Sequence, residues 1–272
     1  MTELITSAQN PRIKRIVLLQ KKKKEREEQE RFVIEGLRIF EDALRSAPDW
    51  IDEIILSNRM RDSETWNGMI RQYSGEMQGR ILQELSDSGR MITVSDEVFD
   101  KAAETVNPQG ILCVMRMMRH SYEEISKRRL LLLENIQDPG NLGTMIRTAE
   151  AAGFTGIIMS GDTADIYSPK VTRSTMGSLF RVPFMYCEDF CGMLRRLKKD
   201  DVTVYGAYLR DGTEYDKIEY ASSAAVLIGN EGNGITDEAI AEADRRIFIP
   251  MSGQIESLNA AIAAAVIMYG MR

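Results

Sequence analysis

Histidine and cysteine are scarce in this chain of 272 residues, in which His120 is the only histidine. A histidine-based zinc site or catalytic triad is therefore excluded unless His120 serves it. The three cysteines are Cys113, Cys187 and Cys191, and none belongs to a Cys-x-x-Cys pair. An odd number of cysteines in this spacing indicates small buried side chains rather than a disulfide framework. Any chemistry must therefore proceed without a histidine network.

Long apolar runs are also missing. No stretch reaches the roughly 18 apolar residues that a membrane helix needs, and no charged-then-apolar leader opens the chain, so we expect a cytoplasmic protein. The longest apolar run, AAIAAAVIMYG at 260–270, is rich in alanine and too short to span a bilayer. Hydrophobic residues make up 43% and charged residues 28% of the sequence, which is typical of a folded globular protein.

Positive charge is concentrated near the beginning of a chain whose net charge is −6. Between residues 10 and 24 there is no acidic residue, and the basic ones are Arg12, Lys14, Arg15, Lys21, Lys22, Lys23 and Lys24. Such a basic arm, here residues 1–30, favours a polyanionic partner such as nucleic acid. The alternative is a solvated helix face whose lysines are balanced by the glutamates at 25, 27, 28 and 30.

Hydrophobic periodicity predicts a first α/β domain over residues 31–115, followed by a charged linker over 116–129. Its predicted strands are 31–36, 51–58, 91–95 and 110–115, and its predicted helical regions are 37–47, 61–87 and 96–104.

A second α/β domain is predicted over residues 130–272. Its strands are apolar almost throughout and are separated by helices, which indicates a parallel sheet covered on both faces. Ligands of such sheets bind at the carboxyl ends of the strands, where loops 137–141, 229–235 and 250–257 fall. The predicted strands are 130–136, 156–161, 182–187, 202–209, 224–231 and 245–250, and the last helix is expected from about Ser257 to the end.

The first of these loops leads into a helix for which Asn141 is a candidate N-cap and Gly153 a candidate stop. Arg147 and Glu150 fall together, away from the apolar face of that helix. They are open to two interpretations, a functional arginine or an i,i+3 ion pair on the surface.

The other two loops have different compositions. In LIGNEGNGI, residues 227–235, closely spaced glycines let the backbone approach a ligand, and Glu231 favours a positive or polar group over a phosphate. The third loop precedes a helix that is apolar nearly all round, with Ser257 as its candidate N-cap and Asn259 just inside it. A helix of this kind is buried on several sides, in a core or against a partner chain.

Taken together and in this order, the three loops resemble the three motifs of the SpoU (TrmH-type) RNA ribose 2′-O-methyltransferases. The matching patterns are N-x-x-x-x-x-R, G-x-E-G-x-G and I-P-M-x-G-x-x-x-S-L-N, and SPKVTRSTMGSLFRVP at 168–183 also resembles the family. The resemblance covers residues 130–272. Residues 31–115, especially FVIEG and NPQGILCV, are similar to the L30e-like substrate-binding domain that many members carry.

The resemblance implies an α/β fold whose C-terminal segment forms a trefoil knot, as in SPOUT-like enzymes, beside a smaller L30e-like α/β domain. It implies S-adenosylmethionine as cofactor, no metal, and a homodimer formed through the C-terminal helix. The implied catalytic residues are Asn141, Arg147, Glu231, Ser257 and Asn259. The implied cofactor-binding residues are Leu209, Gly229, Asn230, Ile249, Met251 and Leu258.

Methylation of a ribose 2′-hydroxyl in RNA is therefore the expected activity, with 23S ribosomal RNA favoured by the L30e-like domain. A tRNA methyltransferase and a non-catalytic RNA-binding protein are the alternatives. RNA capture is expected from the first domain, from Arg12, Lys14 and Arg15 of the basic arm, and from Lys170 and Arg173.

Overall fold

The computed structural model describes residues 4–271, and its contacts divide them into two compact units. The first unit contains residues 4–118 and 167–180, and the second contains residues 119–166 and 181–271. The segment 167–180 thus packs with the first unit although the sequence around it belongs to the second. The domain boundaries predicted from the sequence stay predictions.

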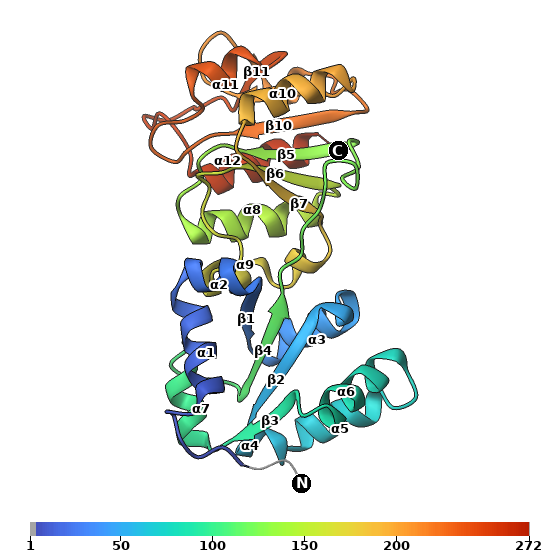
Figure 1. The fold of residues 1–272 in the computed structure, drawn as a ribbon. Coiled ribbons are helices and arrows are strands. Elements are labelled where there is room, and N and C mark those ends of the chain that lie inside the picture. The colour runs from blue at the N-terminus through green and yellow to red at the C-terminus, as the bar shows by residue number, and fades with distance from the viewer. Residues whose placement is uncertain (1–3, 272) are drawn as a thin grey trace. The chain divides into compact units, whose positions relative to one another are not determined.

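The first unit is built on a four-stranded sheet in the order β1-β4-β2-β3 (Figure 1). Strand β4 runs antiparallel to β1 and β2, whereas β2 and β3 are parallel. Its strands are β1 (Arg31–Glu35), β2 (Ile51–Ser57), β3 (Met91–Val94) and β4 (Ile111–Arg116). Its α-helices are α1 (Pro11–Lys21), α2 (Lys23–Gln29), α3 (Leu37–Ser46), α4 (Asn58–Arg61), α5 (Glu64–Gln72), α6 (Met77–Asp87), α7 (Asp96–Ala102) and α9 (Pro169–Thr175), with short 3-10 turns at Pro48–Trp50 and Ser178–Phe180.

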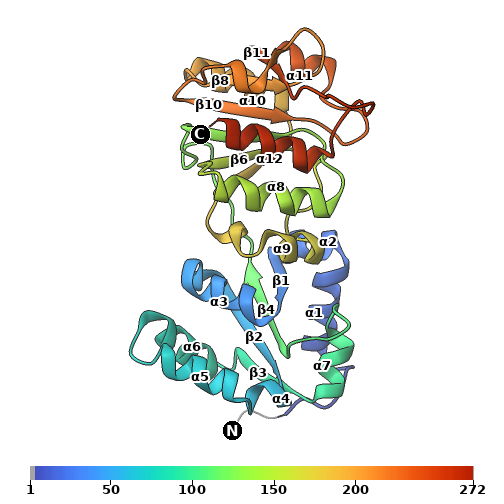
Figure 2. The ribbon, with the colours of Figure 1, turned by 180° about the vertical axis from the view of Figure 1, so that it is seen from behind.

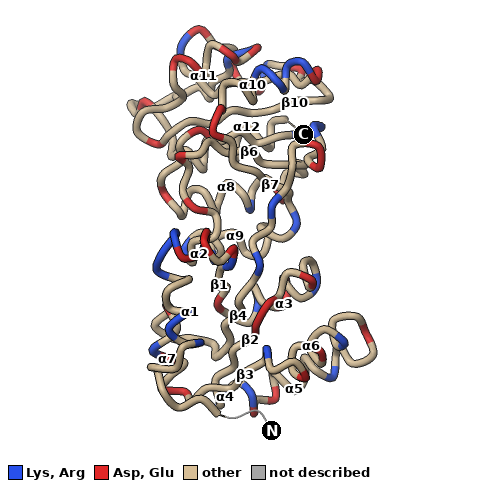
Figure 3. The backbone as a smooth tube through the Cα atoms, viewed as in Figure 1, with Lys and Arg blue, Asp and Glu red and all other residues tan. Residues whose placement is uncertain are grey.

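The basic segment forms two helices that pack onto this unit. Ile16 and Leu19 of α1 are fully buried in the same apolar cluster as residues of β1, β3 and β4. Arg26 of α2, itself buried, donates from Nη1 to the carbonyl oxygens of Leu19 and Gln20 at 2.7 and 3.0 Å and so satisfies the end of α1. Figure 3 shows the basic positions of α1 and α2 with acidic positions of α2 beside them. This segment is therefore part of a folded body.

The second unit is a seven-stranded sheet in the order β7-β6-β5-β10-β8-β11-β9, and every described pair is parallel. The predicted parallel sheet is confirmed, although the short strand β9 was not predicted. Its strands are β5 (Arg129–Leu133), β6 (Gly156–Ser160), β7 (Phe184–Cys187), β8 (Thr203–Ala207), β9 (Thr213–Glu214), β10 (Ala224–Ile228) and β11 (Arg245–Phe248). Its helices are α8 (Pro139–Ala151), α10 (Phe190–Lys199), α11 (Asp237–Ala241) and α12 (Ala260–Gly270), with a 3-10 turn at Tyr215–Lys217.

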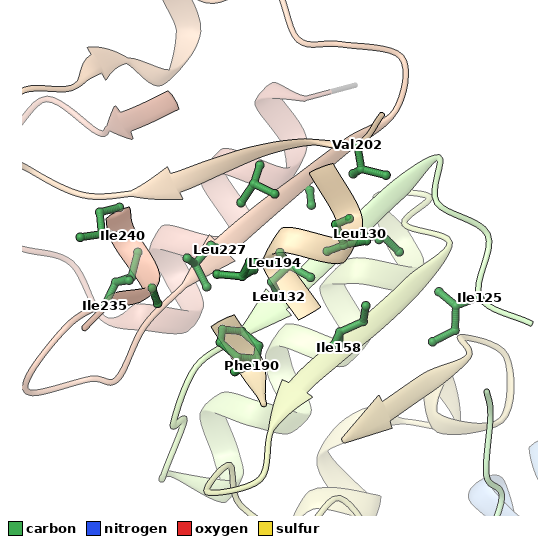
Figure 4. Close-up of a cluster of buried hydrophobic side chains, with 14 of the residues drawn as sticks. Ile125, Leu130, Leu132, Ile158, Phe190, Leu194, Val202, Leu227, Ile235 and Ile240 are labelled. Atoms are coloured by element: carbon green, nitrogen blue, oxygen red, sulfur yellow. The ribbon is translucent and has the colours of Figure 1, made fainter. Parts of the chain in front are cut away.

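Helices cover both faces of this sheet. Helices α10 and α11 lie on one face, and α8 and α12 lie side by side on the other (Figures 1 and 2). Leu130, Leu132 and Leu227 pack against Phe190 and Leu194 of α10 in the cluster of Figure 4. All four leucines of β5, from 130 to 133, are fully buried. This two-sided burial explains why the strands are apolar at successive positions rather than at alternate ones.

Candidate functional site

A pocket of about 430 Å³ opens in the second unit, where β8, β10 and β11 end. Its wall combines segments 207–210, 228–235, 247–251 and 257–267. All six residues assigned to cofactor binding line it: Leu209, Gly229, Asn230, Ile249, Met251 and Leu258. The structure thus brings together residues that lie up to 49 positions apart in the chain, as expected where parallel strands end at one edge of a sheet.

The glycine loop folds back on itself. Asn230 and Gly234 exchange two backbone hydrogen bonds of 3.0 and 2.9 Å, and the Asn230 side-chain oxygen accepts from the amides of Gly232 and Asn233, both at 2.9 Å. Gly234 has a positive φ of +70°. A Cβ at Gly229 would stand 2.3 Å from backbone atoms of Gly234 and Ile235, so only glycine fits this reversal.

The Glu231 carboxylate connects this loop to the first loop. Its two oxygens accept hydrogen bonds from the backbone amides of Gln137 and Asp138, each at 3.1 Å, and from Asn141 Nδ2 at 3.0 Å. Partial burial acts to raise the pKa of Glu231, but these hydrogen bonds favour the ionised form, with Asn141 first among them, and the net pKa is lowered. The carboxylate therefore faces protein donors rather than the cationic or hydroxyl ligand expected from the sequence.

Asn141 is not the N-cap of its helix, contrary to the prediction. Helix α8 begins at Pro139, and the capping residue is Asp138, whose Oδ1 accepts from the Asn141 amide at 2.8 Å. Proline at the first helical position fits there because it has no amide hydrogen to satisfy. This shift leaves the Asn141 side chain available to Glu231. The predicted stop is confirmed at Gly153, which follows the end of α8 with φ +77°.

The third loop joins the same cluster through Asn259. Its Nδ2 donates to Asn141 Oδ1 at 3.1 Å, while its Oδ1 accepts from the amides of Ala261 and Ile262. Asn259 is therefore the N-cap of α12, and the prediction that Ser257 caps this helix is wrong. A side chain that both caps a helix and donates to a neighbour is held firmly in position. Ser257 is exposed and lines the pocket.

Arg147 lies two turns further along α8 with an exposed side chain. Within residues 4–271 it forms no hydrogen bond or ion pair with the protein, and therefore none with the cluster of Asn141, Glu231 and Asn259. The surface ion pair considered for Arg147 and Glu150 is not formed. Glu150 instead pairs with Arg181, whose Nη2 lies 3.0 Å from Glu150 Oε2.

All five residues assigned to RNA contacts lie in the first unit. Lys170 and Arg173 are among them because their helix, α9, packs with that unit. Arg12 and Arg15 approach the buried Glu53 at 3.6 and 3.5 Å, and Arg173 approaches Glu104 at 3.4 Å. Lys14 has an exposed side chain, and Lys170 is on the same short helix as Arg173. Arg12, Arg15 and Arg173 thus already have acidic partners, so their attraction for a polyanion is reduced.

The sequence of the chain matches known families over both of its parts. Residues 128–269 match the SpoU rRNA Methylase family, and residues 10–113 match the MRM3-like substrate binding domain. The chain belongs to the SpoU rRNA Methylase family. This confirms the resemblance drawn from the three loops and from the first domain.

Named relatives extend over nearly the whole chain. It is 35% identical over 268 residues to the 23S rRNA (guanosine(2553)-2′-O)-methyltransferase RlmP of Bacillus subtilis, covering 98% of each chain. It is 30% identical over 245 residues to the 23S rRNA (guanosine-2′-O-)-methyltransferase RlmB of Bordetella pertussis, covering 87% of this chain and 95% of that one. The AdoMet-bound rRNA methyltransferase of Sinorhizobium meliloti superposes with a TM-score of 0.85 at 29% identity, covering 99% and 97%.

A helix able to span a membrane and a cluster of metal-binding side chains are both absent from residues 4–271. None of the helices in this range is long and apolar enough to cross a membrane. The same residues contain no group of three or more His, Cys, Asp or Glu side chains placed to hold a metal ion.

The lowered pKa of Glu231 has a testable origin. Because the folded state favours the ionised form of Glu231, this carboxylate stabilises the folded protein at pH values above 4.5, the ordinary pKa of a glutamate. The stabilisation is lost as the pH falls through the lower pKa that Glu231 has in the folded state. We expect a carbon-13 NMR titration to place the wild-type midpoint below 4.5 and to show it rising in Asn141→Ala. Asn259→Ala is the matched control, since Asn259 touches Asn141 but not the carboxylate. Equal midpoints in the wild type and Asn141→Ala would contradict this assignment.

Proposed function

We propose that this protein transfers a methyl group from S-adenosylmethionine to a ribose 2′-hydroxyl of RNA, with 23S ribosomal RNA as the substrate. The observation that carries the proposal is the pocket at the strand ends, which the second and third family motifs line and to which the first motif is joined by the hydrogen bond from Asn141 to Glu231. Membership of the SpoU rRNA Methylase family supports the reaction class. The named 23S rRNA relatives, which match over nearly the whole chain, support the choice of RNA.

The volume of the pocket, about 430 Å³, is that of a small-molecule site, and its lining suits the chemistry of the cofactor. Ile228, Ile249, Leu258 and Ile267 provide apolar surface for a flat base, and the backbone of the glycine loop provides polar groups close to the ligand. The absence of a side chain at Gly229 is what lets that backbone turn beside the pocket. S-adenosylmethionine would supply a methyl group bound to a positively charged sulfur. No metal is needed for this transfer.

The protein must activate a weak nucleophile, because a ribose hydroxyl is mostly protonated at neutral pH. Arg147 is the residue we assign to this task. Its guanidinium has no partner among the described residues, so it is available to an RNA phosphate and to the oxygen on which negative charge develops. Arginine retains its proton up to a pH of about 12 or more, so we assign charge stabilisation rather than a literal base role, and the proton of the hydroxyl passes to water.

The other motif residues position the reactants. Asn141, Glu231 and Asn259 form a continuous hydrogen-bonded chain that fixes the three loops relative to one another. Ser257 is exposed at the pocket and is placed to orient the ribose. Aligning the hydroxyl with the methyl group contributes up to roughly 7–11 kcal/mol to such a transfer.

Three further properties belong to the proposal. The C-terminal segment, which runs from β11 past the glycine loop to α12, forms the trefoil knot of the family. The protein works in the cytoplasm as a homodimer. Support for the dimer comes from α12, where Ile262 is 51% and Tyr269 46% exposed in the single chain, although the helix is apolar throughout.

A tRNA substrate and a non-catalytic RNA-binding role are the competing functions. The 23S rRNA relatives favour ribosomal RNA, and the intact cluster of Asn141, Glu231 and Asn259 favours catalysis. Methyl transfer assayed separately on ribosomal RNA and on tRNA distinguishes the three functions.

Calorimetry with S-adenosylmethionine tests the placement of the cofactor. We expect Gly229→Val to abolish detectable binding, because even a Cβ at this position meets the backbone of Gly234 and Ile235 at 2.3 Å. Gly232→Ala is the matched control in the same loop, since its Cβ would meet only Asn230 Oδ1, at 3.5 Å, and it should keep its affinity within a few-fold. Unchanged affinity in Gly229→Val would show that the cofactor binds elsewhere.

Single-turnover methylation of the RNA substrate tests the role of Arg147. Arg147→Ala should change the free energy of unfolding by no more than about 0.5 kcal/mol, because the side chain is exposed and unbonded within the described residues. Methyl transfer should nevertheless slow by about 100-fold or more, with nearly constant cofactor affinity. Arg147→Lys should restore little, because an ammonium cannot reproduce the two-pronged guanidinium contact. Thr144→Ala on the same helix is the control, and wild-type transfer in Arg147→Ala would refute the assignment.

Analytical ultracentrifugation tests the dimer. At micromolar concentration we expect a species of twice the chain mass of 30.8 kDa, and Ile262→Asp should convert it to the single-chain mass by placing a charge in the apolar interface. Ile70→Asp, at a 38% exposed position on α5, should leave the dimer intact. A wild-type protein that sediments as a single chain would contradict the proposal.

A further inference from the structure

Glu134, the residue directly after β5, is buried, with a relative exposure of 8%. It was not among the predicted site residues. Its Oε2 accepts from the Thr236 amide at 2.9 Å, and its Oε1 accepts from Thr236 Oγ1 at 2.6 Å. Within residues 4–271 no lysine or arginine forms an ion pair with it. Burying a carboxylate costs free energy of folding when no cation compensates its charge. The two hydrogen bonds from Thr236 therefore mark Glu134 as a residue with a specific role.

Thr236 stands at the far end of the glycine loop. It directly follows Ile235, the last loop residue that lines the pocket, and its Oγ1 also accepts from the Ala239 amide as the N-cap of α11. At the near end of the loop, Asn230 Nδ2 donates to the Asn135 carbonyl at 2.8 Å. The pocket wall is therefore attached to the segment after β5 at both ends, and Glu231 attaches it in the middle.

These attachments determine where the loop lies rather than what shape it has. Its shape follows from the bonds between Asn230 and Gly234, which are internal to the loop. Strand pairing stops at Leu133 and Ile228, followed by one last hydrogen bond from the Glu134 amide to the Ile228 carbonyl at 2.9 Å. Beyond that point, side chains join the glycine loop to the segment after β5, and Glu134 makes this connection at the Thr236 end of the loop.

We propose that Glu134 is a positioning residue for the cofactor pocket, acting through Thr236 on the wall formed by residues 229–235. The inference rests on the proposed function, because it identifies a residue that holds one wall of the S-adenosylmethionine pocket in position. Glu134 does not line the pocket itself, so its effect on the cofactor is indirect. The five residues assigned to RNA capture lie in the other unit, and Glu134 bonds through its side chain to Thr236 and not to Arg147, so a change at Glu134 should leave RNA affinity unaltered.

Isothermal titration of the full-length chain with S-adenosylmethionine tests this role. Glu134→Ala should raise the dissociation constant by roughly tenfold or more, the effect of losing hydrogen bonds to a charged group. Thr236→Val removes only the hydroxyl and should have a smaller effect in the same direction. Thr236→Ser, which keeps both donors, is the matched control and should bind like the wild type. The double variant Glu134→Ala with Thr236→Val should bind only slightly more weakly than Glu134→Ala, because the two changes share one contact and Thr236→Val adds only the loss of the α11 cap.

The stoichiometry of the same titration separates positioning from folding. If Glu134 positions the loop, Glu134→Ala binds close to one cofactor per chain with weakened affinity, and its affinity for RNA is unchanged. If Glu134 serves folding alone, the fraction of binding-competent chains falls while the dissociation constant of the remainder is unaltered, and the inference is overturned. Glu134→Gln keeps the volume of the side chain and one acceptor oxygen. Wild-type affinity for S-adenosylmethionine in both Glu134→Gln and Thr236→Val would also overturn the inference. A wild-type chain that fails to bind the cofactor would instead refute the proposed function.

Discussion

The hydrogen bonds between the Glu231 carboxylate and the amides of Gln137 and Asp138 are the contact on which the site depends. The internal hydrogen bonds of the glycine loop fix its shape but not its position. The bonds of Glu231 join this loop to the start of helix α8, which is anchored in the core. Asn141 and Asn259 extend this contact to the third loop, so that one ionised group organises three distant segments. The lowered pKa of Glu231 expresses the same fact, because the donors that fix the loops also favour the charge.

The parallel sheet makes this convergence possible. Strands β5, β8, β10 and β11 all end at one edge, and each delivers a loop to the same region. Two-sided burial of the sheet by helices fixes those strand ends, and the polar contacts between the loops then determine their final positions. The packed core therefore fixes where each loop begins, and the hydrogen bonds between the loops fix their positions relative to one another. Arg147, on the exposed side of α8, is left unbonded within the described residues, and this is the observation behind its proposed role.

Sequence patterns predicted the sheet and its parallel direction, because apolar runs depend on neighbouring positions, whereas the pocket-lining residues were implied by the resemblance to the SpoU family. The patterns failed at the helix starts, where Asp138 and Asn259 act as caps in place of Asn141 and Ser257. Several polar residues stand near each start, and only the folded chain decides which of them caps. The same limit hid Glu134, whose partner Thr236 lies 102 positions away. The packing of α9 with the first unit likewise follows from tertiary contacts that no local pattern records.

Mapping of ribose 2′-O-methyl groups in total RNA, from cells with and without this protein, tests the central claim most directly. We expect loss of the protein to remove a 2′-O-methyl group from 23S ribosomal RNA. Re-expression of the wild-type chain should restore the modification, whereas a chain with Glu231→Ala, which removes the bonds of this carboxylate to the first loop, should not. Unaltered ribose methylation in all RNA, or the loss of a modification on a base instead of a ribose, would contradict the claim.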